Sequence, residues 1–235
     1  MLHLYYLKMD REMASMEREE WLPYVSEERR ERVARFHYAK DAQRSLFGEL
    51  LARYALCEST GRGNSELKFI QNPFGKPMLA REQDEREIYF NLSHSGQWVV
   101  CAVDHTPVGI DVEELKPISL DIARRFFSKD EYEALLREPE LSQQQYFYAL
   151  WTMKESFIKA DGRGLSLPLD QFTIDVAQGR VQYQQKWQDS RLWHSQLDEE
   201  HMLAVCASSE LHNVTQYFTL SDFVRMVPDK LDLIG

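Results

Sequence analysis

Two segments with helical periodicity, each followed by a glycine-containing loop and short apolar runs, constrain the fold of this chain most. The first helical pattern covers about residues 26–56 and the second about residues 143–160. Each half ends in a similar apolar run, residues 98–103 and 202–207. Buried strands also resemble one another by chance, so the repeat is an indication only. If it is real, it predicts an α+β protein of two like halves with a cleft between them.

The length of 235 residues suits one large domain or two small ones that share an interface. We expect a first half at residues 1–105 and a second at residues 106–235, which ends in a polar tail. No run of about 18 apolar residues is present, so we expect no membrane-spanning helix. The apolar residues 1–7 lack a basic leader and a small-residue cleavage site, and they predict a β-strand and not a signal peptide.

Cysteine use and charge limit the compartment and the partners. The three cysteines lie far apart in apolar surroundings, which predicts buried reduced thiols and a cytoplasmic protein. The formal net charge of −10 argues against general binding to nucleic acid. Basic residues nevertheless cluster between residues 29 and 44. Because glutamates interleave with these arginines, a solvated helix face explains the cluster at least as well as a local anion site.

Residues 107–114 combine a strand pattern with acidic side chains. Side chains alternate along a strand, so Asp111 and Glu113 point to the same side. Two acids one pleat apart repel each other, and they are best tolerated with a cation between them. Gly109 would allow another chain or a ligand to approach the backbone. A strand end with solvated acids explains the pair equally well.

Residues 150–159 form an apolar helical pattern that contains an acid and a base. Glu155 and Lys159 are four residues apart, so they share one face of a helix. Charged groups on a mostly buried helix need partners. Asp111, Glu113 and Glu155 would together form the partial carboxylate shell that Mg²⁺ prefers. Lys159 would then lie near the phosphates that the metal holds.

Residues 91–96 place hydroxyl groups and an imidazole at a strand end. Ser93 and His94 are adjacent, so their side chains diverge and do not form a catalytic pair. No G-x-S-x-G motif indicates a hydrolase of that kind, and neither a P-loop nor a G-x-G-x-x-G motif is present. A phosphate-binding turn and a simple hairpin both remain possible for this segment.

In this combination and order, the motifs resemble those of the 4′-phosphopantetheinyl transferase family. The two signature elements of the family are similar to residues 108–111 and 151–159. The likeness extends to residues 74–77, 91–96 and 116–120, and it covers nearly the whole chain. This resemblance favours a metal site at Asp111 and Glu113 over a strand end with solvated acids.

The resemblance implies an α+β fold of two halves related by a pseudo-two-fold axis. Each half is a small antiparallel sheet packed on a long helix, and coenzyme A lies in the cleft. The short relatives that serve fatty-acid synthesis assemble as trimers, whereas this chain carries both halves, which implies a monomer. The implied reaction is Mg²⁺-dependent transfer of the phosphopantetheine arm to a serine of an apo carrier protein, with release of adenosine 3′,5′-bisphosphate. The implied partners are peptidyl carrier domains of nonribosomal peptide synthetases, with tolerance of acyl carriers.

The resemblance also implies roles for single residues. Glu131 is the base that takes the serine proton, and Lys159 stabilises the departing bisphosphate. The implied Mg²⁺ ligands are Asp111, Glu113 and Glu155. The residues implied to bind coenzyme A are Arg29, Arg32, Ser45, Gly75, Lys76, Pro77, Ser93, His94 and Lys159. Arginines stand at positions 29 and 32 where the family often has lysines, which keeps the charge but not the detailed geometry. Candidates for carrier contact are Lys116, Arg124, Arg125 and residues 165–172.

Two alternative functions are compatible with the same residues. A metal-dependent phosphodiester or pyrophosphate hydrolase would use the same carboxylates and would consume coenzyme A without a carrier. A non-catalytic acidic interaction module would carry Asp111, Glu113 and Glu155 as surface charges and would bind no coenzyme with magnesium.

Overall fold

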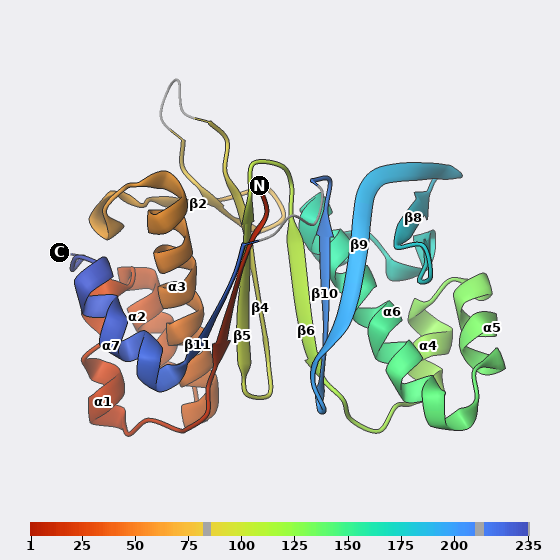
Figure 1. Ribbon diagram of the computed structural model, residues 1–235, viewed down its shortest axis with the longest axis horizontal. Helices are drawn as coiled ribbons and strands as arrows, with labels where there is room; N and C mark the ends of the chain where they lie inside the picture. Colours follow the sequence, from red (N-terminus) through yellow and green to blue (C-terminus); the bar gives the residue numbers. More distant parts are fainter. Residues whose placement is uncertain (82–85, 210–213, 235) are drawn as a thin grey trace.

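The computed structural model of the protein describes residues 1–81, 86–209 and 214–234. Two sheets stand side by side at its centre, and helices cover the outer face of each sheet (Figure 1). This arrangement confirms a mixed α+β fold. Among the described residues, no helix is both long and apolar enough to cross a membrane.

The N-terminal part of the chain contains one long helix, α3 (Ala39–Thr60), which packs on a sheet. The other elements of this part are β1 (His3–Lys8), α1 (Ser15–Glu19), α2 (Glu27–Ala34), β2 (Phe69–Gln71), β3 (Pro77–Leu79), β4 (Tyr89–Ser95) and β5 (Trp98–Asp104). The helical pattern of residues 26–56 therefore forms two helices and not one. The first starts where Ser26 accepts a hydrogen bond from the backbone of Arg29, and the second ends at Gly61 in a left-handed conformation.

The second group of elements repeats the long helix and the sheet. It comprises β6 (Gly109–Glu114), α4 (Leu120–Phe126), α5 (Lys129–Arg137), α6 (Glu140–Asp161), β7 (Phe172–Asp175), β8 (Arg180–Tyr183), β9 (Lys186–Asp198), β10 (His201–Ala207), β11 (Val214–Thr219) and α7 (Leu220–Lys230). Like α3, the long helix α6 ends at a left-handed glycine, Gly162.

The strand order separates the two sheets. The first sheet has the order β11-β1-β5-β4, and the second has the order β6-β10-β9-β8-β7. All neighbours in the second sheet are antiparallel. In the first sheet β1 pairs antiparallel with β5 but parallel with β11. The expectation of two antiparallel sheets is therefore wrong for the first sheet.

The C-terminal residues belong to the first half and not, as was expected, to the second. Residues 214–234 form no polar tail, because β11 completes the first sheet and α7 packs against the core beside α3. Leu220, Phe223 and Val227 recur at helical spacing and are fully buried. Pairing with β11 also covers an edge of β1 that would otherwise be exposed. A division of the rest of the chain after residue 105 stays a prediction.

Three apolar clusters hold the layers together. One lies between the first sheet and helices α3 and α7, and a second lies between α6 and the second sheet. The third joins the two sheets, with Val100 of β5 and Ile110 of β6 among its buried members. Gly109 lets β6 lie directly on α6, because a Cβ atom there would come 1.9 Å from the carbonyl oxygen of Ser156. This close contact sets the distance between the acids of β6 and those of α6.

Candidate active site

A cavity of about 490 Å³ is enclosed by elements from both parts of the molecule, namely α2, α3, β4, β6 and α6. Most of the residues expected from the sequence to bind metal or coenzyme line it. These are Arg29, Arg32, Ser45, Pro77, Ser93, His94, Asp111, Glu113, Glu155 and Lys159. Their roles remain predictions, but the fold brings them together from segments far apart in the sequence.

Asp111 is the most buried acid of this cavity, with 2% of the residue exposed. Its Oδ1 accepts hydrogen bonds from Ser93 Oγ at 2.8 Å and from Lys159 Nζ at 2.6 Å. Its Oδ2 is buried and has no hydrogen-bond partner among the described residues. A buried carboxylate oxygen without a partner is costly unless something else satisfies it.

Glu113 and Glu155 line the same cavity as Asp111. Glu113 Oε2 accepts a hydrogen bond from Ser95 Oγ at 3.0 Å. Burial, together with the charge of Asp111, raises the pKa of Glu155 to about 7. Burial and Asp111 likewise raise the pKa of Glu113, and burial raises that of Asp111 against the opposing effect of Lys159. Such acids resist ionisation unless a cation joins them.

These carboxylates suit a hard divalent cation that takes some of its ligands from the protein and the others from a substrate. Within the described ranges, no three His, Cys, Asp or Glu side chains are close enough to form a metal site by themselves. Mg²⁺ does not need a complete protein cage, because it usually takes one or two carboxylates and fills the other positions with water and phosphate oxygens. The unpartnered Oδ2 of Asp111 is the oxygen that such an ion would satisfy.

The basic cluster of residues 29–44 divides between the cavity and the surface. Arg29 and Arg32 line the cavity, as does Arg44, which donates to the carbonyl oxygen of Gly96 at 2.8 Å. By contrast, Arg35 is exposed and pairs with a glutamate one turn away. Arg30 donates to carbonyl oxygens of residues 22–25, just before α2, and to that of Ile234, so it holds the helix in place. A solvated helix face therefore describes only part of this cluster.

The turn that contains residues 72–77 lies against the end of α6. Gly75, with a φ of 84°, and Pro77 line a neighbouring cavity of about 250 Å³, which Arg29 and Arg32 also border. Lys76 is placed differently, because its Nζ donates to the carbonyl oxygens of Val108 and Lys159. Burial lowers the pKa of Lys76 to about 8.

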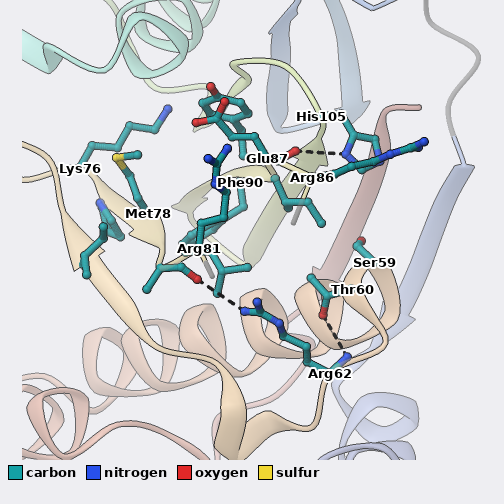
Figure 2. Close-up of a pocket in the computed structure, with 16 residues that line it drawn as sticks. Ser59, Thr60, Arg62, Lys76, Met78, Arg81, Arg86, Glu87, Phe90 and His105 are labelled. Carbon is teal, nitrogen blue, oxygen red and sulfur yellow. Dashed lines mark hydrogen bonds between the residues drawn. The ribbon is translucent and has the colours of Figure 1, made fainter. Parts of the chain in front are cut away.

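The side chain of Lys76 therefore anchors the turn and does not reach the cavity of the acids. It borders a third cavity, drawn in Figure 2, which lies between the end of α3 and the start of β4. That cavity is lined mostly by basic and apolar side chains. If Lys76 contacts the coenzyme as expected, it does so through its backbone and not through its side chain.

Glu131 lies outside these three cavities, and its surroundings favour a structural role; the base role implied by the family resemblance stays a prediction. Only 3% of the residue is exposed. Its Oε1 accepts from the backbone N–H of Ile174 at 2.7 Å, and its Oε2 accepts from that of Ser128 at 2.7 Å. Lys154 Nζ lies 2.8 Å from Oε2 and is fully buried. The carboxylate thus starts α5 and neutralises a buried lysine.

The sequence did contain a signal for this arrangement. Ser128 and Glu131 have the S-x-x-E spacing of a capping box, in which the glutamate side chain bonds to the backbone of the serine. Lys154 lies in the middle of an apolar helical pattern and so required an acidic partner. Ser95 was also missed, although it shares a strand face with Ser93 two residues earlier and holds Glu113.

The expected carrier contacts lie partly at the surface. Lys116 is exposed and pairs with Glu114 at 3.0 Å, and Leu165 is 73% exposed. From Leu167 to Phe172, however, the apolar side chains belong to the buried core beside α6. Leu167, Leu169 and Phe172 are therefore not available to another protein, whereas the exposed residues that alternate with them, such as Pro168 and Asp170, are.

Comparison with known proteins matches most of the chain. A family model described as the 4′-phosphopantetheinyl transferase superfamily matches residues 107–208, and a model of the N-terminal part of 4′-phosphopantetheinyl transferase matches residues 14–106. The 4′-phosphopantetheinyl transferase Sfp of Bacillus subtilis (strain 168) is 42% identical over 88% of this chain and 92% of its own. The 4′-phosphopantetheinyl transferase gsp of Aneurinibacillus migulanus is 38% identical over 78% of this chain and 76% of its own. The human L-aminoadipate-semialdehyde dehydrogenase-phosphopantetheinyl transferase is 30% identical over 80% of this chain and 69% of its own.

Proposed function

Because the chain belongs to the 4′-phosphopantetheinyl transferase superfamily, we propose how its cavity carries out the transfer and which carriers it serves. The enzyme transfers the 4′-phosphopantetheine arm of coenzyme A to carrier proteins. The carriers that we propose are peptidyl carrier domains of nonribosomal peptide synthetases, as in antibiotic biosynthesis. We further propose a cytoplasmic monomer whose two halves are related by a pseudo-two-fold axis.

The proposed position of coenzyme A follows the charges along the cavities. The adenine lies against the turn at Gly75 and Pro77, because this turn borders the smaller cavity. The 3′-phosphate lies among Arg29, Arg32, Ser45 and His94, where positive and hydroxyl groups converge. The pyrophosphate then lies over the hydrogen-bonded pair of Ser93 and Lys159, beside the three acids.

Asp111, Glu113 and Glu155 are the residues that would hold Mg²⁺. The ion, when bound, supplies neutralisation of pyrophosphate charge and alignment of the phosphate to be attacked. Lys159 Nζ, which lies 2.6 Å from Asp111 Oδ1, donates hydrogen bonds to the leaving bisphosphate as negative charge develops on it.

The chemical step joins the serine oxygen of the carrier to the phosphorus of the phosphopantetheine arm and breaks the bond between this phosphorus and the bisphosphate. The serine proton must go to a group that faces the cavity, since Glu131 is in the core. Glu155 suits this task, because it faces the cavity and a carboxylate that gives one oxygen to a metal keeps the other as a proton acceptor. The products are the holo-carrier and adenosine 3′,5′-bisphosphate.

One observation carries the metal proposal most directly, namely the buried Oδ2 of Asp111 without a partner. We expect Asp111→Ala to abolish transfer at any attainable magnesium concentration. Asp121→Ala, which removes an exposed acid from α4, serves as the matched control and should keep wild-type activity. A near-wild-type rate for Asp111→Ala would remove this residue from the metal site.

A further inference from the structure

Behind Arg29 lies a network of buried charges that the transfer reaction does not by itself require. Glu49 of α3 is 7% exposed and Arg53, one turn further along, is 2% exposed. Glu49 borders both the larger cavity and the smaller one, whereas Arg53 is enclosed in the core. A buried ion pair needs good geometry and further hydrogen bonds to offset its desolvation.

Glu49 holds the guanidinium of Arg29 from behind. Its Oε2 accepts from Arg29 Nε at 2.8 Å, and its Oε1 accepts from the backbone N–H of Ser26 at 2.8 Å. Arg29 Nη1 in turn donates to Ser45 Oγ at 2.9 Å. The planar guanidinium is therefore fixed at two of its nitrogens. Because Ser45 Oγ acts as an acceptor here, its own hydrogen is free to donate to an anion.

Arg53 neutralises Glu49, so the charge of Arg29 remains available to a ligand. Arg53 Nε donates to Glu49 Oε1 at 2.8 Å, and its guanidinium lies 4.8 Å from the ring centre of Phe69. Its Nη1 donates to Asn64 Oδ1 at 3.1 Å, and the backbone N–H of Asn64 donates to Asp232 Oδ1 at 2.6 Å. The network thus continues to the segment that follows α7.

We infer that Glu49 is a positioning residue, which orients Arg29 and Ser45 so that the site prefers coenzyme A over coenzyme lacking the 3′-phosphate. This inference rests on the proposed place of that phosphate. In this arrangement Glu49 does not contact the 3′-phosphate. Without Arg29 between the two groups, the negative charge of Glu49 would repel the phosphate. Glu49 therefore contributes by orienting Arg29 and not through its own charge. A guanidinium that is already fixed binds a phosphate with little further loss of conformational freedom.

The test compares calorimetric affinities for coenzyme A and for 3′-dephospho-coenzyme A, both with magnesium. For Glu49→Gln we expect the affinity for coenzyme A to fall about tenfold, the scale of one charge-assisted contact, and that for the dephospho form to change less than about twofold. Arg29→Ala should give the same pattern. The double variant Glu49→Gln/Arg29→Ala should lose little more than Arg29→Ala alone, because both changes remove one coupled unit.

Two further variants separate orientation from charge and from folding. Glu27→Gln removes the same charge from an exposed position in the first turn of α2 that lines neither cavity, and it should leave the preference for coenzyme A unchanged. Glu49→Gln alone leaves the buried Arg53 unpaired and can reduce folding. Glu49→Gln/Arg53→Met removes both charges, and it should fold and still lose the preference.

The outcomes distinguish this inference from the proposed function. Equal loss of affinity for the two coenzyme forms in Glu49→Gln would show a merely structural role, and tighter binding of coenzyme A would show simple repulsion. Recovery of the preference in Glu49→Gln/Arg53→Met would also overturn the inference. If Arg29→Ala keeps the preference, the proposed place of the 3′-phosphate is wrong. If Arg29→Ala loses it and Glu49→Gln keeps it, only the positioning inference fails.

Discussion

Replacement of Glu131 by glutamine should damage the stability of the enzyme and not its chemical step. The ammonium of Lys154 is fully buried, and its acceptors are Glu131 and the carbonyl oxygens of Leu169 and Phe172. Removal of one partner of a buried ion pair usually costs about 3–5 kcal/mol, because the other charge is left without compensation. We therefore expect Glu131→Gln to lower the free energy of unfolding by about that amount.

The pH dependence of this loss has a definite sign. Burial already lowers the pKa of Lys154, and Glu131 opposes that effect. Without Glu131 the pKa falls further, so the unfolded chain binds more protons than the folded one, and the stability of the variant rises with pH. The recovery should reach at most about 1.4 kcal/mol for each pH unit above neutrality.

Denaturant unfolding at several pH values measures both quantities, and transfer assays on the folded fraction measure activity. Glu131→Gln/Lys154→Met should recover stability, because it removes both charges. Glu133→Gln, which changes a half-exposed acid on the same helix, is the control and should change the stability by less than about 0.5 kcal/mol. A fully stable Glu131→Gln with a rate lowered about 10²-fold or more would refute the reasoning and support the base role.

Three further predictions concern the backbone and the acids. Gly109→Ala should cost about 3 kcal/mol or more in an unfolding experiment, because the new Cβ would meet the carbonyl oxygen of Ser156 at 1.9 Å. Gly96→Ala should lower activity for two reasons: Gly96 has a left-handed φ of 54°, and a Cβ there would lie 2.3 Å from His201 Nε2. Added His201→Ala relieves only the contact and not the backbone strain, so it should restore only part of the activity, and full restoration would contradict the strain. Since Glu155 has a pKa of about 7, magnesium with coenzyme A should raise the melting temperature more at pH 8 than at pH 6, and an equal increase would contradict this ionisation.

Local spacing predicted the parts of the site that depend on one element at a time. Strand alternation placed Asp111 and Glu113 on one face, and helical spacing placed Glu155 with Lys159. All four line one cavity in the structure. The family resemblance, and not the spacing, supplied the coenzyme contacts such as Ser93.

The structure differs most from the sequence-based expectations where tertiary contacts decide the outcome. Glu131 follows the same helical pattern whether it faces water or the core, and the packing of α5 on α6 and β7 buries it. The pairing of β11 with β1 joins segments about two hundred residues apart, and no local pattern specifies such a neighbour. Lys76 was assigned to the coenzyme, but the end of α6 offers carbonyl oxygens that bind its ammonium.

The central claim is that this cavity transfers the phosphopantetheine arm to a carrier with the help of the acids around Asp111. Mass spectrometry of an apo peptidyl carrier domain, incubated with the enzyme, coenzyme A and magnesium, tests it most directly. We predict that the carrier gains the mass of one phosphopantetheine on its serine with the wild-type enzyme and gains none with Asp111→Ala or with a metal chelator. Consumption of coenzyme A without modification of the carrier, or equal modification by Asp111→Ala, would contradict the account.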